Sequence, residues 1–206
     1  MTRKIWLAAA MLALGGCRIV SQQELADLQS PPNPHMAAVA QSWQQKLVPQ
    51  VIQDARPVAE LLQALHQEKD FDTACQKLGY RSQDQYPCVF YVKAVGQVVD
   101  INTASRSGKL TLKDISGANV VVQIGPTIRG TQLRDGFKGT TYQDFNDQVL
   151  FGEYGRAIND QAVNMVQKAQ IKVGETREIY GVVSTWDIPD TLPAITPVQI
   201  RRAGGQ

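Results

Sequence analysis

The chain has 206 residues with a formal net charge of +2, and 43% of the residues are hydrophobic. Acidic and basic side chains are interspersed without a basic block, so the charge pattern gives no case for nucleic acid, and we expect no nucleic-acid partner. The hydrophobic fraction is ordinary for a globular protein, so the chain can bury the core of one domain, or of one domain with an appendage.

The N-terminus has the pattern of an export signal. A basic start, Thr2-Arg3-Lys4, precedes an apolar run over residues 5–14 that is too short to span a bilayer as a stable helix. The run ends in Leu14-Gly15-Gly16-Cys17, which resembles the lipobox of bacterial lipoproteins. The resemblance implies cleavage before Cys17 and lipid attachment to its thiol; an uncleaved anchor with a buried thiol is the alternative.

These features predict the location of the protein. We expect a signal peptide over residues 1–16, and a lipidated cysteine with a proline-rich tether over residues 17–35. Two or three acyl chains hold a protein firmly on a bilayer, so the lipid bilayer is the first expected partner and the location is periplasmic. Arg18 follows the cysteine where Asp would signal inner-membrane retention, which favours the outer membrane.

Two further cysteines, Cys75 and Cys88, follow in the exported part of the chain. In an oxidising compartment an even pair of cysteines usually forms a disulfide, and we predict one here. The two histidines, His35 and His66, lack ligand-like spacing to these cysteines, and no Cys-x-x-Cys motif occurs. We therefore expect no metal, and we expect no cofactor.

Residues 36–80 read as a helical segment. Val39, Trp43, Leu47 and Val51 recur every fourth residue, which places them near one helix face, and Pro49 is expected to kink or break that helix. A second helix is expected to start at Pro57, and a third to cover residues 72–78 and stop at Gly79. These apolar faces pack on their own domain or form a partner-binding face.

Strands dominate the rest of the chain. Residues 88–102 are rich in β-branched and aromatic residues, with Gly96 marking a bulge or sharp bend within one long strand. Strands over residues 109–114 and 120–124 complete an antiparallel meander. A helix over residues 145–166, capped by Asp144, precedes strands over residues 178–186 and 198–201.

This order predicts an α+β fold. We expect the helical N-terminal segment to be followed, over residues 86–203, by an OB-like five-stranded antiparallel barrel with a helix between strands three and four that plugs the barrel. A different α+β sheet packed against the same helices is the alternative.

The most distinctive segment lies between the third strand and the long helix. It reads Gly125-Pro126-x-Ile128-Arg129-Gly130-Thr131-x-Leu133-Arg134-Asp135, followed by Asp144-Phe145-Asn146-x-Gln148. This pattern resembles the predicted bacterial periplasmic lipoproteins of domain of unknown function 2291, over most of the mature chain. The resemblance implies no established activity. Genes of the family often lie beside sugar ABC-transporter genes, which implies an accessory role with transporter components as partners.

The polar residues of this segment allow two interpretations. As a ligand- or partner-binding site, forked arginine donors and carboxylate acceptors would contact a carboxylate, a phosphate or sugar hydroxyls; the candidates are Arg129, Arg134, Asp135, Asp144 and Asn146. As a structural element, the same side chains would hold an irregular loop that lacks backbone partners. Tyr91, Tyr180 and Trp186 on predicted strands form either an aromatic platform or part of the core.

No standard catalytic motif occurs, whether a Gly-x-Ser-x-Gly elbow or a phosphate-binding loop, and we name no catalytic residue. The favoured function is a non-catalytic, lipid-anchored binding or accessory module, assisting a sugar ABC transporter. The alternatives are a carbohydrate-active hydrolase of the cell envelope that uses Asp135 and Asp144, and a purely structural envelope lipoprotein.

Overall fold

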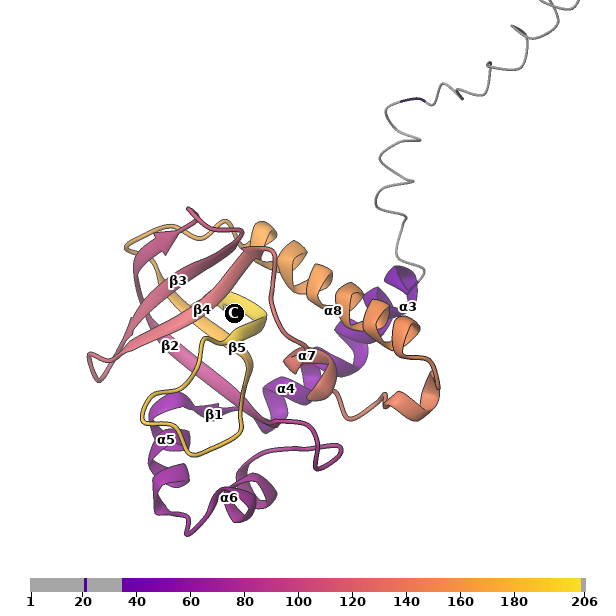
Figure 1. Cartoon of the computed structure of the whole chain (residues 1–206). Helices are drawn as coiled ribbons and strands as arrows, with labels where there is room; N and C mark the ends of the chain where they lie inside the picture. Colours follow the sequence, from indigo (N-terminus) through magenta and orange to yellow (C-terminus); the bar gives the residue numbers. More distant parts are fainter. Residues whose placement is uncertain (1–20, 22–34, 205–206) are drawn as a thin grey trace, which may run out of the picture. The chain divides into compact units, whose positions relative to one another are not determined.

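The computed structural model describes residue 21 and residues 35–204, and its folded unit is Pro34–Gln206 (Figure 1). The predicted signal peptide, the predicted lipidation site Cys17 and nearly all of the predicted tether lie outside the described residues. Among the residues that are described, no helix has the length and hydrophobicity to cross a membrane.

Helical segments form the first part of the unit and separate the strands later in the chain. They are α3 (Met36–Ser42), η2 (Trp43–Leu47), α4 (Val48–Asp54), α5 (Val58–Gln67), α6 (Phe71–Leu78), α7 (Gln132–Asp135), η3 (Tyr142–Asp144) and α8 (Gln148–Ala169). The strands are β1 (Arg56–Pro57), β2 (Cys88–Asn102), β3 (Ser107–Asp114), β4 (Asn119–Pro126), β5 (Thr176–Thr185) and β6 (Thr196–Arg202).

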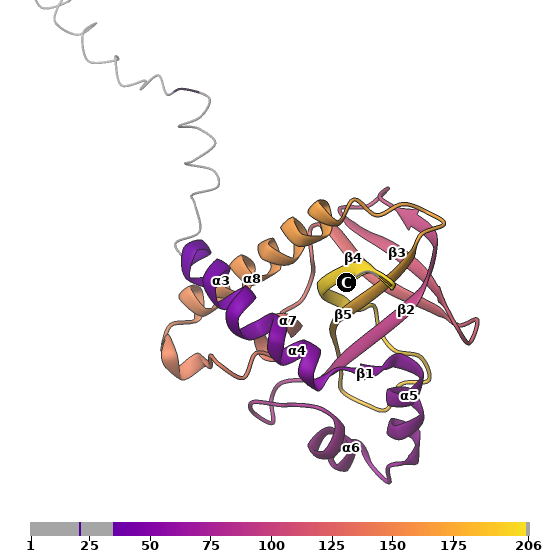
Figure 2. The ribbon, with the colours of Figure 1, turned by 180° about the vertical axis from the view of Figure 1, so that it is seen from behind.

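The first helix continues through Pro49, where we expected a kink or break. Segments α3, η2 and α4 follow one another as a single rod (Figure 2). Segment η2 is π-helical, and the N–H of Val48 donates to the carbonyl of Trp43, five residues back. Proline has no N–H to give to a regular helix, and here the wider turn lies directly before it.

The strands form one curled sheet in the order β4-β3-β2-β5-β6, with the short β1 parallel to β2. The neighbouring pairs along that order are antiparallel. The two edges approach each other where Val122 forms a parallel bridge with Ile195, just before β6. The sheet therefore has six strands rather than the predicted five, because two residues before α5 add to the edge of β2.

Strand β2 is one long strand, as predicted, but its irregularity is not at Gly96. The register against β3 shifts between Val98 and Asp100. Gly96 has a different role, because a Cβ atom there would collide with the carbonyl oxygen of Lys113. The glycine thus allows two backbones to approach closely, which is a second common reason for glycine within a strand.

Alternating residues of the sheet face two apolar clusters. On β2, Phe90 and Val92 belong to the cluster inside the curl, together with buried residues of β3, β4 and β5, whereas Val89 and Tyr91 face the cluster outside it. The inner cluster receives Leu61 from α5 and further buried residues from α6. Helices α5 and α6 therefore cover one end of the curled sheet.

Helix α8 follows β4 and precedes β5 in the chain, and it packs outside the curl. Its buried Ala157, Ile158 and Ala162 join the outer cluster together with Trp43 and Val51 of the first rod. The helix we expected to plug the barrel therefore covers an outer face, beside the α3–α4 rod (Figure 2). The apolar face of the α3–α4 rod, which carries Val39, Trp43, Leu47 and Val51, also packs on its own domain.

Candidate functional site

The predicted site residues lie in the segment 125–148, here called the signature loop, between β4 and the start of α8. Side chains from other elements hold its backbone. The Gln123 Oε1 accepts from the Arg129 N–H at 3.1 Å, and the Asn159 Nδ2 donates to the Gly130 carbonyl at 2.9 Å. Gln123 is itself fixed by a 2.9 Å hydrogen bond to the buried hydroxyl of Thr196. The loop is thus anchored on both sides of Arg129.

Arg134 and Asp135 form an internal pair. Their charged groups are 2.7 Å apart, and their side chains are only 10% and 4% exposed. The other carboxylate oxygen of Asp135 accepts a hydrogen bond from the Thr131 hydroxyl. The Arg134 guanidinium stacks over the Phe151 ring, 3.9 Å from its centroid. These contacts tie α7 to α8, which supports the structural interpretation of both residues.

Asp144 and Asn146 also have local structural partners. The Asp144 carboxylate accepts from the N–H of Thr141 at 2.7 Å, forming a capping box around η3. Asn146 adopts a positive φ of 50° and donates its amide to the Gln143 carbonyl at 2.9 Å. The prediction that Asp144 caps the long helix is wrong: α8 starts later, and its N-cap is Asp147.

Arg129 differs from the other four candidates. Its side chain is exposed, and within residues 35–204 its guanidinium forms no hydrogen bond or ion pair. Its backbone, however, is fixed by Gln123. An arginine with a fixed backbone and an unpaired head group is available to a partner, because part of the entropy cost of ordering it has already been met.

Asp135 and Asp144 were also the candidate hydrolase residues. The Asp135 carboxylate is engaged by Thr131 and Arg134, and that of Asp144 by the cap of η3. A catalytic acid–base pair needs groups that reach a substrate proton. Both oxygens of Asp135 are engaged, and one oxygen of the exposed Asp144 accepts both bonds from Thr141, so each carboxylate has a local structural role.

The next part of the signature loop rests on β2 and α4. The Tyr91 hydroxyl donates to the Gly136 carbonyl at 2.6 Å, and the Gln50 amide donates to the same oxygen at 2.8 Å. Burial, with the nearby Asp54 charge, raises the pKa of Tyr91. Lys138 completes the contact through a 2.7 Å ion pair with Asp54. These bonds anchor residues 136–138 of the signature loop to β2 and α4.

The three aromatic residues considered for a platform are not equivalent. Tyr91 and Tyr180 are buried in the outer cluster, whereas Trp186 is 61% exposed at the end of β5. Two of the three therefore belong to the core, as the packing interpretation expected.

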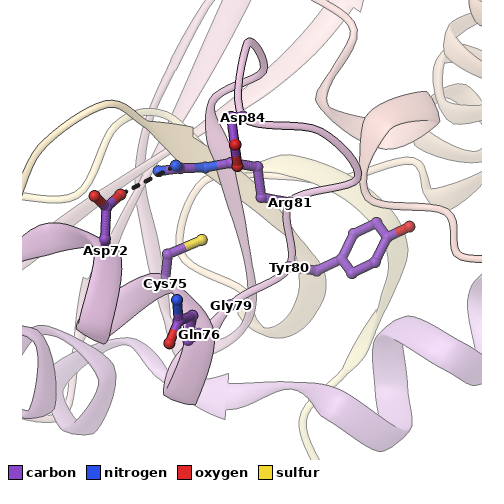
Figure 3. A pocket seen from close by; sticks show the side chains of 7 residues that line it. All are labelled: Asp72, Cys75, Gln76, Gly79, Tyr80, Arg81 and Asp84. Atoms are coloured by element: carbon purple, nitrogen blue, oxygen red, sulfur yellow. Dashed lines mark hydrogen bonds and ion pairs between the residues drawn. The ribbon is translucent and has the colours of Figure 1, made fainter.

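The predicted disulfide is present between Cys75 of α6 and Cys88 at the start of β2, with Cα atoms 5.9 Å apart. It closes a loop whose residues border a cleft of about 660 Å³. The cleft, here called the disulfide cleft, is lined by Asp72, Cys75, Gln76, Gly79, Tyr80, Arg81 and Asp84. Arg81 reaches toward Asp72 across the cleft, and the Tyr80 ring turns the other way (Figure 3).

Contacts with α6 and its N-terminus fix polar side chains of this cleft. The Arg81 guanidinium pairs with Asp72 at 3.1 Å and lies 5.3 Å from the centroid of the Phe71 ring. Asp70 caps α6 by accepting from the Thr73 N–H at 2.8 Å, and that bond lowers the pKa of Asp70. The cleft thus has a preformed wall of one helix and one disulfide-linked loop.

Two smaller hollows adjoin the same disulfide-linked loop. One, of about 440 Å³, is lined by residues that include Asp54, Gly79 and Lys138. The other, of about 180 Å³, is lined by residues that include Gln83, Arg134 and Asp135. Arg129 and Asn146 line none of these three cavities. Arg129 therefore lies outside the lining of these three cavities.

No sequence pattern predicted a role in binding for Asp72, Gln76, Arg81 or Asp84. Their signal was their position within or next to a disulfide loop, where polar side chains are held on a constrained backbone. Among residues 35–204, no group of three or more His, Cys, Asp or Glu side chains is arranged to hold a metal ion.

Comparison with protein families identifies a match over most of the chain. The model of the family described as "Predicted periplasmic lipoprotein (DUF2291)" matches residues 7–201. The chain belongs to this family. The match confirms the resemblance inferred from the signature loop, and the family description supports a periplasmic, lipid-anchored protein.

Solved structures add the fold. A crystal structure of an OB-fold protein (tm0957) from Thermotoga maritima has a TM-score of 0.59 at 14% sequence identity, covering 81% of this chain and 97% of that chain. It shows an OB-type fold here, and at this identity nothing further. The OBody AM1L10 bound to hen egg-white lysozyme matches 63% of this chain and 95% of that chain at 14% identity, with a TM-score of 0.28. A search of curated proteins found no match.

Proposed function

We propose that this family member is a non-catalytic accessory protein of a sugar ABC transporter, lipid-anchored on the periplasmic face of the outer membrane. Its docking contact is Arg129 of the signature loop. The soluble periplasmic binding protein is the proposed partner, because a protein held on the outer membrane can meet it by diffusion. The membrane assignment rests on Arg18, and the transporter link on the family resemblance.

The observation that carries this proposal is the contrast within the signature loop. Arg134 and Asp135 form an ion pair with each other, and Asp144 belongs to the capping box of η3. Arg129 stays exposed on a backbone that Gln123 and Asn159 hold in place. An exposed arginine that lines none of the three cavities described above suits an acidic protein surface better than a small ligand, which is normally enclosed on several sides.

Crosslinking in intact cells tests the docking contact. The native lipoprotein, its Arg129→Ala variant and a matched Arg202→Ala variant are crosslinked, and the captured partners are identified by mass spectrometry. Arg202 is also exposed, at the C-terminal end of β6, where it makes a 3.5 Å ion pair with Glu175, so it controls for loss of surface charge. We expect the binding protein with the native chain and with Arg202→Ala, and a strongly reduced yield with Arg129→Ala.

Other outcomes contradict the proposal. Capture that is equal in all three chains places the contact elsewhere, and the absence of any transporter component supports the purely structural envelope lipoprotein. Fractionation of the two membranes checks the location separately: recovery with the inner membrane removes the outer-membrane part of the proposal and directs attention to the permease as partner.

A further inference from the structure

The geometry points to a second, separate site: we propose that the disulfide cleft binds a small, uncharged, hydroxyl-rich ligand, a mono- or disaccharide. Its volume of about 660 Å³ lies in the range of small-molecule sites, about 300–1,000 Å³. The proposal does not depend on docking through Arg129, because that residue does not line the cleft.

The lining groups fit hydroxyls. Arg81 supplies N–H donors, Asp72 and Asp84 supply acceptors, and the exposed Gln76 amide supplies both. A sugar hydroxyl both donates and accepts, and neighbouring hydroxyls match the paired atoms of planar carboxylate, amide and guanidinium groups. Figure 3 shows these side chains around the same hollow, from α6 and from the loop that follows it.

The charges argue against an anion. Arg81 is already neutralised by Asp72 at 3.1 Å, while Asp84 makes no ion pair with any other residue in the described part of the chain. A phosphate or carboxylate would therefore lie close to the carboxylates of Asp72 and Asp84, and the Arg81 guanidinium is already paired with Asp72. Like charges repel, so an anion would bind poorly. An uncharged ligand can use the same donors and acceptors without that cost.

The cleft is formed before any ligand arrives. The disulfide fixes Cys75, which lines the cleft. Gly79 is pressed against it so closely that a Cβ atom there would lie 2.6 Å from the Cys88 sulfur. The stack on Phe71 orients Arg81, whose side chain is 16% exposed. A preformed site lowers the ordering cost of binding, so weakly held hydroxyl contacts suffice.

Titration calorimetry on the full-length lipoprotein in detergent micelles tests the site. The probes are D-glucose, D-xylose, D-ribose and maltose, with inorganic phosphate and spermidine as the anionic and cationic arms. We expect at least one sugar to bind, and Gln76→Ala and Asp84→Ala each to weaken it about tenfold, as for the loss of one or two hydrogen bonds. Gln85→Ala is the matched control, because Gln85 is exposed on the same loop but does not line the cleft.

Three results would overturn the proposal: no heat with any of the four sugars, sugar binding that both cleft variants leave unchanged, or tighter binding of phosphate or spermidine than of every sugar. Thermal melts of each variant show whether it is folded. Because this test uses purified protein, its failure is separate from a failure of crosslinking in cells.

Discussion

Arg134 and Asp135 are adjacent in the sequence and are each other's partners, with 2.7 Å between the guanidinium and the carboxylate and both side chains buried. The most conspicuous charges of the signature loop thus hold the loop to the domain. The Arg134 guanidinium also stacks on the Phe151 ring of α8, which links the loop to that helix. A signature can therefore mark the residues that build a surface rather than those that touch a ligand.

Arg134→Ala is expected to destabilise the domain by about 3 kcal/mol, because it leaves the Asp135 charge buried without its cation. Arg129→Ala removes an exposed side chain and should change the free energy of unfolding by less than about 0.5 kcal/mol. Urea denaturation of both variants measures the difference. Equal stability losses would mean that Arg129 is also structural, which would weaken its assignment to docking.

Tyr91→Phe is expected to reduce stability by about 1 kcal/mol, since it deletes the 2.6 Å hydrogen bond to Gly136 but leaves that carbonyl paired with Gln50. Tyr142→Phe is the matched control, because its hydroxyl makes no hydrogen bond within residues 35–204. Urea midpoints of the two variants give the comparison. A Tyr91→Phe protein as stable as the native one would show that the Gln50 bond alone is sufficient at the Gly136 carbonyl.

The strands were predictable because their signals are local. Residues 109–114 alternate polar and apolar side chains, and this is β3; the β-branched run that begins at Cys88 is β2. The disulfide was also predictable, since compartment and parity decided it before any geometry. These inferences need only neighbours in the sequence or the chemistry of two residues.

The roles of the signature residues were not predictable from one sequence. Gln50 and Gly136 are 86 residues apart, and no local pattern shows that they bond. The start of α8 was misplaced because Asp144 and Asp147 are both good caps. The positive φ of Asn146 and the extended backbone of Asp147 separate the two helical segments. The disulfide cleft depends on how α6 and the following loop fold together.

Removing the disulfide with Cys75→Ala and Cys88→Ala together is expected to cost about 3 kcal/mol on the chain-entropy model, because the two cysteines are 13 positions apart in the sequence. The same change should weaken any ligand of the disulfide cleft, because Cys75 forms part of its wall. Urea denaturation with and without a reductant checks this. A native protein that the reductant leaves unchanged, while the double variant is destabilised, would locate the loss in side-chain packing.

Asp147→Ala is expected to destabilise the domain by about 1 kcal/mol, because its carboxylate accepts hydrogen bonds from the N–H groups of Val149 and Leu150. Gln148→Ala, at an exposed position of the same turn, serves as control. Thermal melts of both variants give the result. If Gln148→Ala were as harmful as Asp147→Ala, the loss would reflect the exposed turn in general and not the cap.

Glu178 makes part of the stability dependent on acid pH. Burial raises its pKa, but hydrogen bonds from Lys93 and Arg201 outweigh that effect, and the net pKa lies below its usual value of 4.5. A folded-state pKa below the unfolded one gives stabilisation that is fully present above pH 4.5 and is lost as the pH falls through the folded value.

Glu178→Gln should therefore be less stable than the native chain at neutral pH, and the difference in urea midpoint between the two proteins should narrow as the solution is acidified. Glu175, whose pKa Arg177 also lowers, remains in both chains, so its contribution cancels in the comparison. A gap that stays constant across this range would show that Glu178 contributes through packing and hydrogen bonding alone, and not through its charge.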